Sequence, residues 1–386
     1  MTRRTLLWRS VAVFTLIVTL VAGRGFILAT LASGSYPLSA FCFDTAALML
    51  LLAWLHAVDA AFTAGMQWIA KTIPPSWQAV VIQSARLPFV LLVLFPFMIV
   101  AINVHPQRIR CLETPASLGM QFEKVALTSD GISLSAWYVP GEMTPGPAIV
   151  IAHGLGANKQ NFLTPVASLH ERGYSVLIFD FRAHGDSGGQ LSTYGLLESR
   201  DVKSAYDWLA NRHPGQPIYA LGYSMGGAAV ARAVFEYDIF DKVVLDSTFS
   251  SLRSIAHHRF LRFFGPFESL VWGEGRFWAR LWTRSDFGDN DTTRCASALR
   301  KRPLLLIHGQ QDRLIPFTES VLIHDAVGAH AQLWLVPDAG HVETTFAPDY
   351  ALKLDSFFRE GVRDSGGSLE SRNCRPYSAA TPKLQP

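Results

Sequence analysis

The chain has 386 residues, 49% of them hydrophobic, and its 34 Lys and Arg against 31 Asp and Glu leave a net charge of only +3. It contains no dense basic run, which excludes nucleic acid as an expected partner. The length allows one large domain with an appended region, and the apolar residues are concentrated before about Asn103. That distribution indicates membrane segments rather than an oversized core.

The first 104 residues are predicted to form a membrane region with two or three transmembrane helices. The first apolar run, 11–32, is either the core of a signal peptide or a span, and retention as a span is favoured because further apolar segments follow. The second, 46–65, contains His56 and Asp59, which would face other helices or lie near the interface. The third, 87–104, has no charged residue and is the clearest candidate.

The placement of Lys and Arg predicts the orientation of this region. A basic N-terminal tail and the lack of Lys or Arg in 33–45 place the N-terminus inside, so three spans would put the next domain outside the cytoplasm. Arg108 and Arg110, just after the third segment, argue against this placement of the domain. A region with only two spans would leave the domain in the cytoplasm. We expect a multi-pass protein of a bacterial cell membrane with an extracytoplasmic catalytic domain, where Cys111 and Cys295 could form a disulfide.

A linker over 105–120 leads to a predicted α/β domain over 121–362. Continuous apolar runs indicate strands in a sheet that is covered on both faces, after an initial antiparallel pair. The residues 363–386 are rich in Ser, Gly, Pro and Arg and are predicted to be a disordered tail. The expected strands are 122–127, 132–139, 148–152, 175–180, 217–220, 242–245, 303–307 and 332–336, and the expected helices include 198–211, 228–237 and 348–360.

A G-x-S-x-G motif, Gly222 to Gly226, stands between an expected strand and an expected helix. A sharp turn here strains the backbone, and glycines without a Cβ let the neighbouring chain pass close by. Such a turn would expose Ser224 Oγ at a helix N-terminus, where developing negative charge is favoured. The motif therefore predicts Ser224 as a nucleophile, the alternative being a tight turn with an incidental serine.

A glycine-rich loop over 153–158 follows the expected strand 148–152. In such a loop, backbone N–H groups can point at a reacting oxygen. We predict that the N–H groups of Leu155 and Met225 form an oxyanion hole. The alternative is an ordinary glycine turn.

Asp312 and His341 each follow one of the last two expected strands. The chain order of nucleophile, acid and histidine is the one that α/β-hydrolases use. Asp312 would fix the tautomer of His341, and His341 would act as general base because an imidazole titrates near neutrality. Asp246 is the alternative acid, while His184 precedes the nucleophile and is expected to be structural.

Residues of about 250–302 are predicted to form a helical cap inserted between two strands. The segment is rich in Phe, Trp and Arg. Its apolar face could line an acyl pocket while the arginines meet lipid phosphates. Equally, the cap could simply pack on the core.

Over roughly 121–360 the chain resembles α/β-hydrolases of the serine aminopeptidase-like group. The resemblance implies an α/β-hydrolase fold, with a mostly parallel central sheet flanked by helices and a helical cap, here preceded by an N-terminal transmembrane helical region. Members of such groups include esterases, acyl-thioesterases, lysophospholipases and peptidases, often with a single N-terminal anchor, from which the longer apolar region here departs. The motifs that carry the resemblance are His153-Gly154, Asp180-Phe181-Arg182-Ala183-His184-Gly185-Asp186-Ser187, Gly222-Tyr223-Ser224-Met225-Gly226-Gly227, Leu245-Asp246-Ser247-Thr248-Phe249, His308-Gly309-Gln310-Gln311-Asp312 and Gly340-His341.

We therefore expect a membrane-anchored serine hydrolase that cleaves a carboxylic ester or thioester of an acyl or lipid-like substrate through an acyl-enzyme, with no metal or organic cofactor. A serine peptidase with the same triad is the first alternative. A non-catalytic membrane scaffold with a hydrolase-like binding domain is the second. A transport-associated or signalling role for the membrane region is the third.

Overall fold

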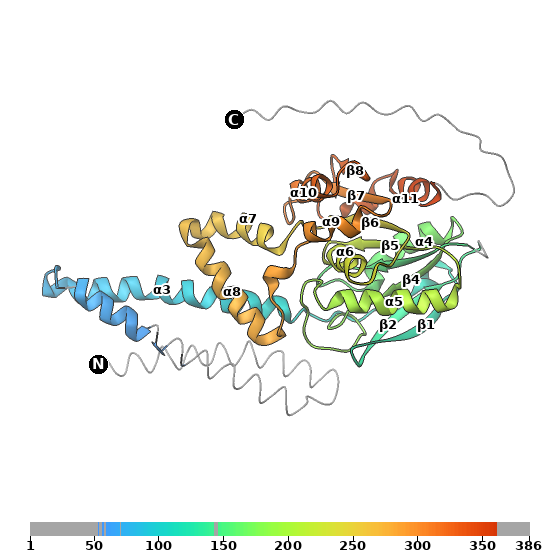
Figure 1. Ribbon diagram of the computed structural model, residues 1–386. Coiled ribbons are helices and arrows are strands. Elements are labelled where there is room, and N and C mark those ends of the chain that lie inside the picture. Colours follow the sequence, from blue (N-terminus) through green and yellow to red (C-terminus); the bar gives the residue numbers. More distant parts are fainter. Residues whose placement is uncertain (1–52, 54–55, 58, 70, 143–145, 361–386) are drawn as a thin grey trace.

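The computed structural model describes most of the chain after residue 52 (Figure 1). The first expected membrane segment, 11–32, and the expected tail, 363–386, lie outside the described residues, as does part of the second membrane segment. The described residues are 53, 56–57, 59–69, 71–142 and 146–360.

An eight-stranded sheet forms the centre of the domain, in the order β1-β2-β4-β3-β5-β6-β7-β8. The β1–β2 and β2–β4 pairs are antiparallel and all the other pairs are parallel. The expected mostly parallel sheet is thereby confirmed, and the loops that follow its parallel strands meet at one edge. The strands are β1 (Glu123–Ser129), β2 (Ile132–Val139), β3 (Ala148–Ala152), β4 (Ser175–Phe179), β5 (Ile218–Tyr223), β6 (Lys242–Asp246), β7 (Leu304–Gly309) and β8 (Ala331–Val336).

Helices cover both faces of the sheet, so the central strands are buried throughout. Alternate residues of a strand point to opposite faces, and accordingly Val150 belongs to one apolar cluster and Ile149 to the other. Helices α5 (Glu198–Arg212), α6 (Met225–Tyr237), α9 (Ala296–Leu299) and α10 (Thr318–Val327) pack on the first face, and α4 (Leu163–His170) and α11 (Tyr350–Arg359) pack on the second. Helices α4 and α10 were not predicted from the sequence.

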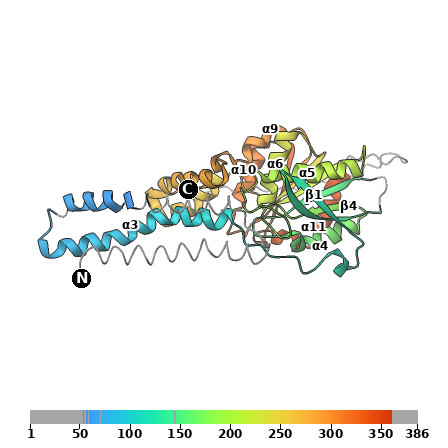
Figure 2. The same cartoon turned by 90° about the horizontal axis from the view of Figure 1, so that it is seen from below.

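Between β6 and β7 the chain forms a hairpin of two helices, α7 (Leu252–Phe264) and α8 (Glu268–Thr283). The preceding helix α3 (Pro75–Val104) runs beside it, and Phe97 packs against Trp278 and Trp282 with ring centroids 5.2 and 5.0 Å apart. Helix α3 and the hairpin project from the same side of the sheet domain (Figures 1 and 2).

Helix α3 contains the third expected membrane segment, 87–104, and begins at residue 75, twelve residues before that segment. Within the described part of the chain, no helix is both long enough and apolar enough to cross a bilayer. Asp59, which was expected to face other helices or the interface, pairs with Arg86 of α3 at 2.7 Å. Cys111 and Cys295 are both free thiols, so the disulfide considered from the sequence does not form.

Candidate active site

The turn between β5 and α6 holds Ser224 in a backbone conformation that side chains rarely adopt, with φ 53° and ψ −117°. The Ser224 N–H donates to the Asp246 carbonyl at 2.8 Å, which ties the turn to the neighbouring strand. A Cβ on Gly222 would lie 2.6 Å from Gly227 Cα, and one on Gly226 would lie 2.2 Å from the Ala152 carbonyl oxygen. Both positions therefore require glycine, and the motif has a steric cause.

Three predicted site residues form one hydrogen-bonded chain. His341 Nε2 lies 3.0 Å from Ser224 Oγ, and His341 Nδ1 lies 2.7 Å from Asp312 Oδ2. When Nδ1–H donates to the carboxylate, Nε2 is left with a lone pair that can accept the Ser224 proton. The three residues come from loops after β5, β7 and β8, which end at the same edge of the sheet.

The Asp312 carboxylate is surrounded by donors. Its Oδ1 accepts the N–H groups of Leu314 and Ile315 at 2.8 Å each, and its Oδ2 lies 3.2 Å from His308 Nε2 as well as facing His341. Burial alone would raise the pKa of Asp312, but the hydrogen bonds from His308 and His341 outweigh it and hold that pKa well below its usual range. The carboxylate is therefore ionised at neutral pH, as an acid that stabilises an imidazolium must be. His308 was not predicted to contribute here.

Asp246, the alternative acid, does not contact His341. Its buried carboxylate accepts three hydroxyl groups, and burial, the largest influence, raises its pKa. The Ser247 hydroxyl also accepts the N–H of Val342, next to His341, at 3.1 Å. Asp246 therefore fastens the loop that carries the histidine without touching its ring. Its three hydroxyl donors are Ser247 Oγ at 2.9 Å, Thr344 Oγ1 at 2.7 Å and Tyr350 Oη at 2.9 Å.

The glycine-rich loop after β3 lies against the serine. A Cβ built on Gly154 would be 3.3 Å from Ser224 Cβ and 3.8 Å from its Oγ. The N–H groups of Leu155 and Met225, the expected oxyanion pair, have no hydrogen-bond partner among the described residues. Both are therefore available to an oxygen atom at this site.

His153 holds this loop in place, a role that the sequence analysis did not assign. Its Nδ1–H donates to the Gly154 carbonyl at 2.7 Å, and its Nε2 accepts the Phe181 N–H at 3.0 Å. Burial keeps the pKa of His153 well below its usual value, so the ring is neutral and its tautomer is defined by these two bonds. Because a trans peptide directs its carbonyl and its N–H to opposite sides, fixing the Gly154 carbonyl also fixes the Leu155 N–H.

His184 lies behind His153, with ring centroids 5.1 Å apart, and contributes no hydrogen bond to the Ser224–His341–Asp312 chain. Its Nδ1–H donates to the Arg182 carbonyl at 2.8 Å, while its buried Nε2 has no partner among the described residues. Burial, the largest influence, lowers its pKa. The His184 ring is therefore neutral, and it packs against the His153 ring.

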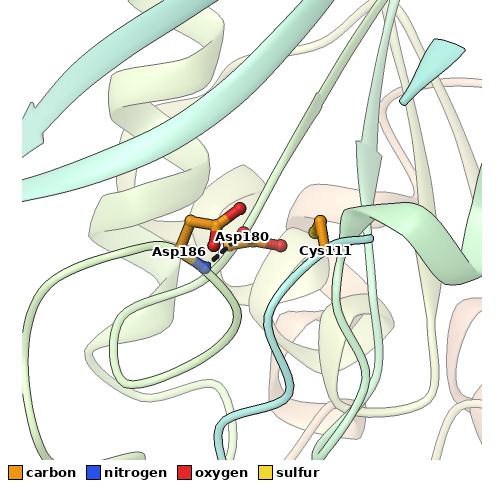
Figure 3. Close-up of side chains that lie close together, drawn as sticks. All are labelled: Cys111, Asp180 and Asp186. Carbon is orange, nitrogen blue, oxygen red and sulfur yellow. Dashed lines mark hydrogen bonds between the residues drawn. The ribbon is translucent and has the colours of Figure 1, made fainter. Parts of the chain in front are cut away.

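A second cluster of polar side chains lies at the end of β4. Cys111, Asp180 and Asp186 bring ligand-type atoms within 4.8 Å of one another (Figure 3). The Lys159 ammonium lies 2.5 Å from Asp180 and 2.9 Å from Asp186, so it already supplies a positive charge to both carboxylates. Burial raises the pKa of the Cys111 thiol to about 11, which disfavours the thiolate that a metal needs. The cluster therefore fits a structural ion pair better than a metal site.

Comparison with known proteins adds a family context. The family model described as serine aminopeptidase, S33, matches residues 144–294. The chain is 31% identical to YfhR of Escherichia coli (strain K12), over 57% of this chain and 74% of YfhR. It is 24% identical to the membrane protein YNL320W of Saccharomyces cerevisiae, over 62% of this chain and 80% of that protein.

Two further similarities concern proteins with a named activity. The lysophosphatidylserine lipase ABHD12 of Xenopus tropicalis is 30% identical over 47% of each chain. The solved structure of the esterase Pf2001 of Pyrococcus furiosus superposes with a TM-score of 0.55 and 26% identity, over 67% of this chain and 98% of the esterase.

Proposed function

This chain belongs to the serine aminopeptidase-like family of α/β-hydrolases, and we propose that it is a membrane-anchored serine hydrolase that cleaves a carboxylic ester or thioester of an acyl or lipid-like substrate. The observation that carries the proposal is the hydrogen-bonded chain from Ser224 through His341 to Asp312. Similarity to an esterase and to a lipase supports ester cleavage. The apolar first 104 residues and a membrane protein among the relatives support membrane anchoring.

The reaction begins when Ser224 Oγ attacks the carbonyl carbon of the substrate. His341 Nε2 takes the serine proton, and the ionised Asp312 stabilises the resulting imidazolium. The N–H groups of Leu155 and Met225 donate to the negative oxygen of the tetrahedral intermediate. The intermediate then collapses to an acyl-serine, and His341 returns the proton to the departing alcohol or thiol.

Water completes the cycle. His341 removes a proton from a water molecule as that water attacks the acyl-serine, and the second tetrahedral intermediate collapses to release the carboxylic acid. The proton held by His341 passes back to Ser224 Oγ. Every step uses side chains and backbone groups of this chain, with water as the co-reactant.

Labelling with a fluorophosphonate probe tests the nucleophile, and a series of acyl esters and thioesters tests the substrate class. We expect the wild type and the control Ser204→Ala to be labelled and Ser224→Ala to remain unlabelled, with His341→Ala labelled far more slowly. Labelling of Ser224→Ala at the wild-type rate would refute the assignment. Turnover of short peptides without turnover of esters would favour the peptidase alternative, and a folded wild type that neither reacts nor turns over would favour the scaffold alternative.

A further inference from the structure

The end of the α7–α8 hairpin carries a concentration of exposed apolar side chains. Leu261 and Phe263, at the end of α7, are 50% and 76% exposed, and Phe267 and Leu270, in the turn and at the start of α8, are 56% and 59% exposed. We call these four residues the apolar tip. Single exposed apolar residues are ordinary, but large side chains grouped at one protruding end indicate a contact surface.

The exposed surface of the hairpin becomes cationic toward the sheet domain. On α8, Leu270, Phe277 and Arg280 follow one another at steps of seven and three residues, so they share one side of the helix, and Arg284 follows directly as the residue that caps its C-terminus. All four are exposed, and neither arginine forms a salt bridge with any described residue. On α7, the exposed Arg259 lies two residues before Leu261, the first residue of the apolar tip, and about one turn before Phe263.

An apolar end followed by cations is the pattern of an element that enters a lipid interface. Apolar side chains are stabilised among the acyl chains, while arginines one or more turns away meet the phosphates of the headgroups. A purely apolar protein partner would not require the charge, and a purely acidic partner would not require the exposed phenylalanines. Anionic phospholipids satisfy both requirements.

Helix α3 sets the direction in which the apolar tip points. Phe95, in the C-terminal half of α3, packs against Phe264 at the end of α7 with ring centroids 4.8 Å apart. The hairpin turn therefore lies beside this part of α3, and the residues 75–93 extend past it, away from the sheet (Figure 2). Those 19 residues, counted from 75 to 93, span about 28 Å at 1.5 Å per residue. The described residues between 56 and 69 fold back along this part of α3, where Phe62 stacks on Phe89 with ring centroids 4.5 Å apart, so the described part of the second expected membrane segment lies beside the stretch of α3 toward which the apolar tip points.

The root of the hairpin is joined to the active site. The buried Glu319 accepts the Ser250 N–H at 2.9 Å and the Ser254 hydroxyl at 2.6 Å, and it lies on α10 shortly after the Asp312 loop. Farther along α7, close to the apolar tip, Arg259 donates to the carbonyl of Leu314, whose N–H binds Asp312. Insertion of the apolar tip into a bilayer would therefore also fix the distance between the membrane surface and the loop that carries the catalytic acid.

We propose that the apolar tip of the α7–α8 hairpin inserts into the headgroup and acyl boundary of a bilayer that contains anionic phospholipid. The hairpin holds the active site at the membrane surface, where it takes amphiphilic acyl esters directly from the bilayer. The choice of substrate rests on the proposed function, whereas the contact of the apolar tip with lipid does not.

An environment-sensitive label on the full-length chain tests the contact. The four native cysteines are replaced by alanine, and one new cysteine is introduced by Leu270→Cys or, as the control, by Leu352→Cys. Leu270 and Leu352 are both 59% exposed, but Leu352 lies on α11 of the sheet domain. Each protein is labelled with a nitrobenzoxadiazole dye and reconstituted into vesicles of phosphatidylcholine, with or without an equal amount of phosphatidylglycerol.

The label at 270 should shift its emission to the blue and be quenched by doxyl-labelled lipid, while the label at 352 should remain in water. Quenching at 270 should be at least about threefold stronger when phosphatidylglycerol is present, because the arginines are attracted to it. Equal signals at the two positions would overturn the inference. Shielding at 270 that appears in detergent without phospholipid and grows with protein concentration would also overturn it, because a second copy would then cover the apolar tip.

Turnover separates this inference from the proposed function. The double substitution Phe263→Asp with Leu270→Asp should lower the ratio of vesicle-borne to soluble ester hydrolysis by about tenfold, and Leu352→Asp should leave that ratio unchanged. An unaltered ratio in the double variant would contradict membrane delivery while leaving the esterase proposal intact. If the wild type hydrolysed neither ester, the proposed function would fail, and the label at 270 would still decide the lipid contact.

Discussion

The substitution Asp312→Asn tests which of two buried aspartates supports the catalytic histidine. In the structure, all the contacts of the Asp312 carboxylate are with donors: two backbone N–H groups on Oδ1 and two histidine nitrogens on Oδ2. An asparagine offers one acceptor and one donor group, so one side of the new amide must oppose a donor. The backbone N–H groups cannot turn away, and the amide oxygen is therefore expected to remain on their side.

The amide nitrogen would then face His341 and force its Nδ1 to accept. The proton would move to Nε2, which lies 3.0 Å from Ser224 Oγ and could no longer take the serine proton. Loss of the correct tautomer typically lowers kcat by about four orders of magnitude, and this corresponds to about 5 kcal/mol of transition-state stabilisation. We expect a loss of that order for Asp312→Asn.

Asp246→Asn is the matched control, because Asp246 is equally buried at the neighbouring strand end. Its partners are hydroxyl groups, which can rotate to accept from an amide as readily as they donate to a carboxylate. We expect this variant to lose about tenfold or less in kcat, with a larger effect on thermal unfolding. Steady-state hydrolysis of a chromogenic ester and circular dichroism melting measure the two effects. A kcat for Asp312→Asn within tenfold of the wild type, or an equal loss in folded Asp246→Asn, would refute the reasoning.

Three further outcomes are expected. The folded pKa of Asp312 is depressed, so the contribution of its carboxylate to stability is present above about pH 4 and is lost as the pH falls further. The difference in melting temperature between wild type and Asp312→Asn should therefore become smaller below about pH 4. A difference that stays constant with pH would contradict this expectation. Gly154→Ala should lower kcat by about tenfold to a hundredfold with little change in melting temperature, because its Cβ would meet Ser224 Cβ at 3.3 Å, and unchanged turnover would mean that the loop adjusts. Lys159→Met should cost about 3–5 kcal/mol of unfolding free energy by leaving the buried Asp180 carboxylate without its cation, whereas Lys203→Met, at an exposed pair, should cost less than about 1 kcal/mol in the same denaturant titration.

Two helices were absent from the sequence analysis for a physical reason. The apolar residues of α4 and α10 are less clearly segregated to one face than those of α11, which was predicted and is as short as α10, so these two helices lack a distinct amphipathic pattern. The strands were easier to place, since a strand buried on both faces is a continuous apolar run whatever its neighbours are. The chain order of the motifs then indicated the sheet to which these strands belong.

The sequence by itself determined the features whose cause is local. Gly222 and Gly226 are required because the chain passes too close for a Cβ, and that requirement is visible in the motif around Ser224. The positions of Asp312 and His341 after strands follow from the same kind of local pattern. The contacts of His153 and His308 could not be read in this way, because each joins groups that are distant along the chain or depend on loop geometry.

Only the tertiary structure decided between alternative interpretations of the same local sequence pattern. Asp246 ends β6 and Asp312 follows β7 at the same edge of the sheet, and only the folding of the last loop shows that Asp312 is the one bonded to His341. In the same way, an apolar helix face is identical in sequence whether lipid or protein covers it, because both surroundings are apolar. Phe97 of α3 packs against Trp278 of the hairpin, and that contact became visible only when two segments far apart in the chain were brought together by the fold.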